Sequence, residues 1–374
     1  MEIVGVALSV TGLWVFLGLN YSLKPYSDPM MWYLFGKGFP AEFGTTGRAY
    51  GFPLLIYLAS LVAGPFRVFL INIPLLGIML VMSYLLARTL CRQAGSWVSS
   101  WAPLCGAAAV FMLVRMDLPM LLYLTNPYRD PLAFILMMGS VLCLLRFVHQ
   151  ESHPLRWVAA SAFLFAMGIA ARDTVILMGL PYIIFMIWAR LRDRTLPFGK
   201  AAVVGGLVFI LAFAPQAWQN RLVSGHSIVP AQAAEEIERK GSVTPGVRAD
   251  FFADTFPNTV AYLWKQYGWG LTGLFALGVG AAAWKRHAGL LALCLPGTIV
   301  YFLFYAGYKS VMARYLLVVD MLAVPVMAFG VAVLLRGALR MLRLLRVENS
   351  LAPVLGLVLL AATAAILLLQ KPEA

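Results

Sequence analysis

The chain has 374 residues, of which 61% are hydrophobic and only 12% are charged. A soluble domain carries about 25% charged residues and could not present so apolar a surface to water. The composition therefore excludes a soluble protein and predicts an all-α polytopic membrane protein. The formal net charge of +13 does not indicate a nucleic-acid partner, because no soluble segment is large enough to carry a nucleic-acid-binding domain.

Apolar runs recur through the whole chain, so we treat 1–374 as a single transmembrane domain. A membrane span needs about 20 mostly apolar residues. We expect about eleven spans, at 3–20, 67–89, 96–114, 131–148, 156–171, 174–190, 201–218, 266–284, 288–306, 315–335 and 351–369. The first run has no basic segment before it and no small-residue cleavage site after it, so we expect a retained span.

Basic residues in the short loops predict the orientation, because Lys and Arg concentrate on the cytoplasmic side of a membrane. One set of alternating loops carries 14 basic residues against four acidic ones, and the other side carries 15 basic and 12 acidic residues. We therefore expect the first side to be cytoplasmic, with the N-terminus inside. The protein is predicted to lie in the cytoplasmic (inner) membrane.

Three longer segments are predicted on the external, periplasmic side: a first loop at 21–66, a turn at 116–130 and a long loop at 219–265. Within the first loop, 51–64 is apolar but too short to span, which favours an interfacial helix lying on the membrane. Within the loop at 219–265, we expect short helices at 231–240 and 245–266. The latter mixes charge with aromatic residues, as suits a lid resting at the membrane interface.

Ionisable residues gather at the external membrane boundary, where they are costly unless they have a partner or a task. Asp28 lies between two prolines, close to Trp32 and Tyr33. Arg129-Asp130 opens the fourth span, and Arg172-Asp173 separates the fifth from the sixth. Snorkelling arginines and helix caps account for many such residues, yet the surroundings of Asp28 favour a functional role. No His, Cys or Glu set has metal-site spacing.

Several short segments, taken in order, resemble those of a known family. They are Asp28-Pro-Met-Met-Trp-Tyr33, Phe52-Pro-Leu-Leu-Ile-Tyr-Leu58, Arg129-Asp130-Pro-Leu-Ala133, Met167-Gly-Ile-Ala-Ala-Arg-Asp173, Pro215-Gln-Ala-Trp-Gln-Asn220 and Ala313-Arg314-Tyr-Leu-Leu317. Their order and side of the membrane resemble the GT-C superfamily of membrane glycosyltransferases, which includes the protein O-mannosyltransferases and the lipid A aminoarabinose transferase.

The resemblance implies transfer of a sugar, with inversion, from a polyprenyl-phosphate-linked donor to an acceptor on the external face. Asp28 is the expected general base and Asp130 the second choice. The expected substrate-binding residues, mainly cations for the donor phosphate, are Tyr33, Arg48, Arg129, Arg172, Asp173, Lys309 and Arg314.

This chain departs from the family pattern in ways that leave part of the function open. Its first loop has a single Asp where relatives have an acidic pair, and Arg172 stands in the position of a Lys. No cofactor is expected, dependence on a divalent metal stays open, and the acceptor is a glycan, a lipid or a protein. The competing hypotheses are a transporter or flippase of lipid-linked sugars and a glycan ligase or polymerase.

Overall fold

The computed structural model describes residues 28–39, 41, 43, 49–64, 71–93, 128–149, 153–225, 256–284, 287–306 and 313–344. Every regular element among them is a helix. The helices are α2 (Asp28–Gly38), α3 (Gly51–Ala63), α4 (Asn72–Gln93), α8 (Asp130–Val148), α9 (Pro154–Ala171), the 3-10 helix η2 (Asp173–Met178), α10 (Gly179–Arg192), α11 (Phe198–Ser224), α13 (Phe256–Trp284), α14 (Ala288–Ala306) and α15 (Ala313–Leu344).

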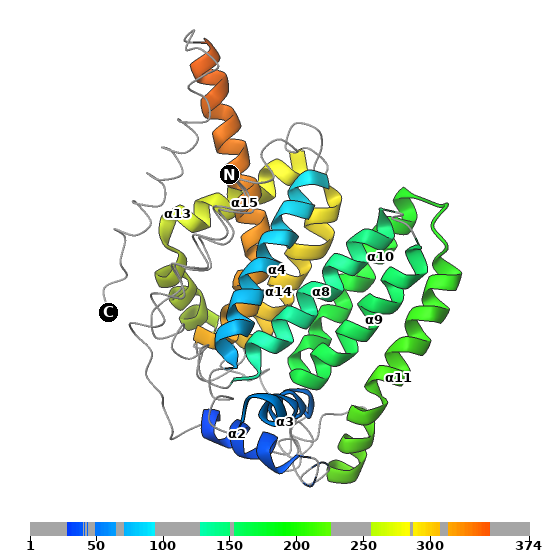
Figure 1. The fold of residues 1–374 in the computed structure, drawn as a ribbon. Helices are drawn as coiled ribbons and strands as arrows, with labels where there is room; N and C mark the ends of the chain where they lie inside the picture. The colour runs from blue at the N-terminus through cyan, green and yellow to red at the C-terminus, as the bar shows by residue number, and fades with distance from the viewer. Residues whose placement is uncertain are drawn as a thin grey trace.

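Most of the long helices form one bundle (Figure 1). α8 contacts α4 and α9, while α15 contacts α4, α13 and α14. α8 is apolar around most of its circumference and buries Phe134, Met137, Val141 and Phe147, among others. A helix that is apolar all round is stable when protein or lipid surrounds it. α11, at the edge, is only 6% buried along its apolar window, so most of its side chains would face lipid.

Five helices among the described residues are long and apolar enough to cross a membrane. They are Asn72–Cys91, Asp130–Val148, Pro154–Ala171, Asp173–Arg192 and Phe198–Ser224, which match the predicted spans at 67–89, 131–148, 156–171, 174–190 and 201–218. Shorter apolar helices at Gly268–Trp284, Leu290–Tyr305 and Met321–Leu334 fall within or close to the predicted spans at 266–284, 288–306 and 315–335. The predicted spans 3–20, 96–114 and 351–369 lie outside the described residues. The all-helical fold is confirmed for the described part, and the count of about eleven spans stays a prediction.

Glycines mark the end of one helix and a kink in another. α11 continues beyond the predicted end at 218 and stops at Gly225, whose φ of 73° is the left-handed conformation typical of a helix C-cap. α13 contains a kink at Gly268, with φ 61° and ψ −173°, at the predicted junction between an interfacial helix and a span. The helix predicted at 231–240 lies outside the described residues.

Two short helices from the first loop lie across one end of the bundle (Figure 1). α3 is the helix predicted at 51–64, and its first residue, Gly51, packs closely against α9. A Cβ at Gly51 would lie 2.9 Å from the carbonyl of Ala170, so the absence of a side chain permits this contact. α2 packs on α3 through Trp32 and Phe52, whose ring centroids are 6.0 Å apart.

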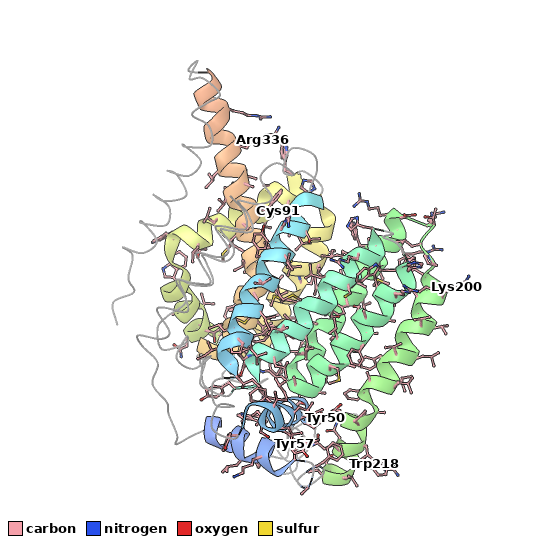
Figure 2. The ribbon with its side chains drawn as sticks, in the orientation of Figure 1. Tyr50, Tyr57, Cys91, Lys200, Trp218 and Arg336 are labelled. Carbon is pink, nitrogen blue, oxygen red and sulfur yellow. The ribbon has the colours of Figure 1, made fainter. Side chains whose placement is uncertain are left out.

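The two ends of the bundle differ in their charged residues. Cys91, Lys200 and Arg336 lie towards the upper end in Figure 2, and Tyr50, Tyr57 and Trp218 lie at the lower end with α2 and α3. Arg146, Arg190 and Arg192 occupy the last turns of α8 and α10, at the upper end. We call the lower end, with α2 and α3, the site end of the bundle.

Candidate active site

Asp28 is the first residue of α2, and Pro29 follows it at the first helical turn. The sequence predicted a loop fixed by two prolines; the structure has a helix start instead, because proline fits the first turn of a helix without losing a hydrogen bond. The side chain of Asp28 lies outside the described part. Position 28 lies one helical turn before Trp32 on the same face of α2.

Trp32 joins α2 to the start of α8. Its side chain is only 3% exposed, and the guanidinium carbon of Arg129 lies 5.0 Å from its ring centroid. A guanidinium at this distance from an indole makes a favourable cation–π contact. The helix that begins at Asp28 is thereby held beside the predicted phosphate-binding Arg129.

Arg172, of the pair Arg172-Asp173, and Asp130, of the pair Arg129-Asp130, form a buried ion pair. Their side chains are 4% and 6% exposed. Nη2 of Arg172 also donates a hydrogen bond of 3.0 Å to the phenolic oxygen of Tyr305. The pairing joins α8, the turn after α9, and α14. Arg172 thus forms its ion pair with Asp130 on α8. It also interacts electrostatically with its sequence neighbour Asp173.

Asp173, at the start of η2, lies within electrostatic reach of both Arg129 and Arg172. Two arginines and two aspartates from the predicted set therefore gather at the site end. We call Arg129, Asp130, Arg172 and Asp173 the Arg–Asp cluster. Its formal charge is zero when both carboxylates are ionised.

Local backbone geometry explains how the Arg–Asp cluster is assembled. Arg172 is extended, with φ −154° and ψ 117°, which ends α9 and turns the chain into η2. Tyr301 donates a 2.9 Å hydrogen bond to the carbonyl of Thr174, and the hydroxyl of Tyr305 lies 3.3 Å from that of Thr174. These contacts fasten η2 to α14.

The start of α8 is fastened in a similar way by Asn72, the first residue of α4. Its side-chain nitrogen donates a 2.8 Å hydrogen bond to the carbonyl of Tyr128. Two buried polar atoms nearby, Oδ1 of Asn72 and Nη1 of Arg129, have no hydrogen-bond partner among the described residues. Such groups are costly to bury, so they are candidates for contact with a ligand.

A second polar cluster joins α11 to α3. Nε2 of Gln216 donates hydrogen bonds to Oε1 of Gln219, at 3.2 Å, and to Oδ1 of Asn220, at 2.9 Å. Oε1 of Gln216 accepts a 3.3 Å hydrogen bond from the backbone N–H of Tyr50. All three amides are at least 97% buried. Because Tyr50 precedes Gly51, which packs on α9, this cluster also belongs to the site end.

The remaining predicted site residues are only partly described. Tyr33 lies on α2, half-buried at the edge of the cluster around Trp32. Arg314 is in the first turn of α15, and its side chain is not described. Arg48 and Lys309 lie outside the described residues. Within the part that the structure describes, no three His, Cys, Asp or Glu side chains gather as a metal site would require.

Sequence reasoning missed several residues that build this end, chiefly Asn72, Tyr301 and Tyr305. Each carried a signal: Asn72 is a polar residue in an apolar run, and the two tyrosines are four residues apart near the end of a predicted span. What the sequence could not show is which of the charged residues these groups would support.

The arrangement suits recognition of an anion beside an apolar surface. The guanidiniums of Arg129 and Arg172 lie at the site end, and Nη1 of Arg129 is buried with no hydrogen-bond partner among the described residues. Arginine binds phosphate through parallel, charge-assisted hydrogen bonds. Carboxylates beside them can accept a proton from a hydroxyl group.

The comparisons with known proteins bear on the fold. No family model and no curated protein matches the sequence. Among solved structures, the chain is similar to the oligosaccharyltransferase from Archaeoglobus fulgidus in its apo form, with a TM-score of 0.63 and 14% sequence identity. The match covers 100% of this chain and 56% of the archaeal protein, so this chain spans little more than half of that protein's length. The chain therefore shares its fold with this oligosaccharyltransferase, a membrane glycosyltransferase of the kind that its sequence resembles.

Proposed function

We propose that the protein is a membrane glycosyltransferase that moves a sugar from a polyprenyl-phosphate-linked donor to an acceptor hydroxyl, with inversion. The observation that carries this proposal is that Arg129, which lies over Trp32 of α2, and Arg172 gather around Asp130 and Asp173 at one end of the bundle. The fold, shared with an oligosaccharyltransferase, supports transfer of a sugar. The lipid-linked donor rests on the sequence resemblance and on the apolar surroundings of the cluster.

In this proposal the two arginines bind the donor phosphate and stabilise its charge as it leaves. Arg172 is already compensated by Asp130, whereas Nη1 of Arg129 is buried with no hydrogen-bond partner among the described residues. A phosphate oxygen beside Arg129 would satisfy that donor. We therefore assign the main phosphate contact to Arg129 and a positioning role to Arg172.

The acceptor would attack the anomeric carbon in one displacement. The new bond joins the acceptor oxygen to that carbon, the bond from the carbon to the phosphate oxygen breaks, and polyprenyl phosphate leaves. A carboxylate takes the hydroxyl proton, which contributes about 10²–10⁴-fold. The ion pair with Arg172 already engages the carboxylate of Asp130 in a structural contact. Asp28 is therefore the better candidate.

The proposed site faces the exterior of a cytoplasmic membrane. Lys and Arg of the opposite end, such as Arg146, Arg192 and Lys200, are exposed, as the positive-inside rule expects of the cytoplasmic side. A lipid-linked donor suits an exterior site because nucleotide sugars are made in the cytoplasm. The acceptor, a glycan, a lipid or a protein, is the part that experiment must identify.

The test uses the purified full chain with radiolabelled polyprenyl-phosphate sugars and candidate acceptors. Wild type should transfer label, and Asp28→Asn and Arg129→Gln should each lose at least about 100-fold in kcat/KM. Arg156→Gln, an exposed residue at the start of α9 at the other end, is the matched control and should retain activity. Transfer that survives in a folded Asp28→Asn variant would overturn the base assignment. Movement of lipid-linked sugar across vesicles without transfer would identify a flippase instead.

A further inference from the structure

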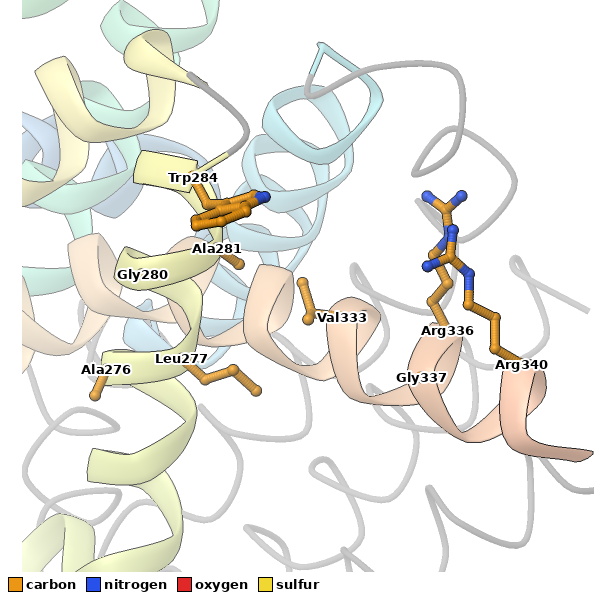
Figure 3. A pocket seen from close by; sticks show the side chains of 9 residues that line it. All are labelled: Ala276, Leu277, Gly280, Ala281, Trp284, Val333, Arg336, Gly337 and Arg340. Atoms are coloured by element: carbon orange, nitrogen blue, oxygen red, sulfur yellow. The ribbon is translucent and has the colours of Figure 1, made fainter.

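A groove lies between α13 and α15, away from the Arg–Asp cluster. It has a volume of about 530 Å³ and is lined by Ala276, Leu277, Gly280, Ala281, Trp284, Val333, Arg336, Gly337 and Arg340. Its floor is apolar and made largely of small residues, while its polar groups are arginines from a single helix (Figure 3). We propose that this groove binds one anionic phospholipid, with an acyl chain along the small residues and the headgroup phosphate on Arg336 and Arg340.

Glycines explain why the groove exists where it does. α13 and α15 come together at Gly278, where a Cβ would lie 2.1 Å from the carbonyl oxygen of Val326, and at Gly330, where it would lie 2.3 Å from that of Leu274. Small residues permit such close approach of membrane helices. At Gly280 and Gly337 a Cβ would meet nothing within 4 Å. The same two helices therefore enclose open space just beyond their closest contact.

The polar end of the groove has the chemistry of a lipid headgroup site. Arg336 and Arg340 are four residues apart on α15, one helical turn, and in Figure 3 both side chains extend from the same side of this helix. Trp284, the last residue of α13, is 83% exposed and lines the same groove. Tryptophan favours the headgroup region of a bilayer, and basic pockets between membrane helices bind anionic headgroups.

Charge complementarity selects an anionic lipid over a neutral one. Among the described residues that line the groove, both charged ones, Arg336 and Arg340, are basic. Arg336 lies on the part of α15 that extends beyond the other helices (Figure 2). A zwitterionic headgroup would bring its own positively charged ammonium group close to these arginines, which would repel it. Because the groove is distant from Asp28 and Arg129, this inference does not depend on the proposed transfer reaction.

The test titrates the purified full chain in detergent with phosphatidylglycerol, phosphatidylcholine or glycerol phosphate, and counts bound molecules by native mass spectrometry. We expect wild type to bind one phosphatidylglycerol in preference to the other two. The double variant Arg336→Gln/Arg340→Gln should bind it about 25-fold more weakly, from about fivefold for each arginine. The matched control, Arg156→Gln/Arg192→Gln, removes the same charge elsewhere and should bind like wild type.

A second variant separates the groove from general charge attraction. Gly280→Leu adds a side chain to the open space without changing any charge, and should weaken phosphatidylglycerol binding several-fold. Unchanged binding in either the double arginine variant or Gly280→Leu would overturn the proposal. Equal binding of phosphatidylcholine, binding of glycerol phosphate as tight as that of the lipid, or equal loss in the control would also overturn it. Because this assay measures lipid binding alone, its result stays interpretable even if the protein shows no transfer activity.

Discussion

The buried ion pair between Arg172 and Asp130 gives the sharpest prediction about the site end. Removing one partner of a buried pair leaves an uncompensated charge, which costs about 3–5 kcal/mol, whereas an exposed pair contributes about 0.2–1 kcal/mol. With side chains 4% and 6% exposed, this pair belongs to the first class. Arg172→Gln should therefore lower the free energy of unfolding by about 3–5 kcal/mol.

The two single variants should differ because their surroundings differ. Asp130→Asn leaves Arg172 with Tyr305 as a hydrogen-bond acceptor and with Asp173 in electrostatic reach. Arg172→Gln removes the cation that serves both carboxylates. We expect Asp130→Asn to be the milder change. The double variant Asp130→Asn/Arg172→Gln should be more stable than the sum of the single effects, by about 2–3 kcal/mol.

Reversible unfolding in mixed micelles of detergent and sodium dodecyl sulfate, followed by tryptophan fluorescence, measures these free energies. Arg146→Gln is the control, since Arg146 is exposed at the other end of α8 and lies 4.5 Å over the ring of Trp157. It should cost about 1 kcal/mol or less. Additive effects of Asp130→Asn and Arg172→Gln, within about 0.5 kcal/mol, would refute the reasoning that the two side chains act as a pair.

The remaining predictions concern packing and pH. Gly278→Ala would place a Cβ against a carbonyl of α15, so it should destabilise the protein by about 1–3 kcal/mol in the same unfolding assay. Gly273→Ala, the control, lies in open space on the same helix. It should be neutral or stabilising by up to about 1 kcal/mol. Burial raises the pKa of Tyr50 above its ordinary value of 10.0, so its contribution to stability is present below pH about 10 and is lost at higher pH. The Tm of wild type minus that of Tyr50→Phe should fall as pH rises past 10, and a difference independent of pH would contradict this.

The sequence predicted that the four members of the Arg–Asp cluster lie at the external membrane boundary, but not that they contact one another. Arg129-Asp130 precedes one apolar run and Arg172-Asp173 follows the next. Two consecutive helices joined by a short loop lie antiparallel, so the start of the first and the end of the second meet at one end of the bundle. Segment length, a separate signal, predicted α3, since 51–64 is apolar but too short to span.

The sequence did not reveal which side chains of the site contact one another. The cross-pairing of Arg172 with Asp130 depends on the extended backbone at Arg172, which the sequence pattern does not reveal. The contribution of Tyr305 depends on α14 lying against η2, a packing choice that many apolar helices could satisfy equally. For the same reason, the buried amides around Gln216 were visible only as a family-like segment of the chain.

The charge of the Arg–Asp cluster places a demand on the rest of the proposed site. A sugar linked through a phosphodiester carries one negative charge, and loss of the sugar leaves a phosphate monoester with about −1.5 to −2. With both aspartates ionised, the two arginines and two aspartates sum to zero, and in that state the cluster orients the donor but does not by itself neutralise the growing charge. Additional positive charge must reach the leaving phosphate for the reaction we propose. Arg48, Lys309 and Arg314 are the predicted source within this chain, and a divalent metal is the other.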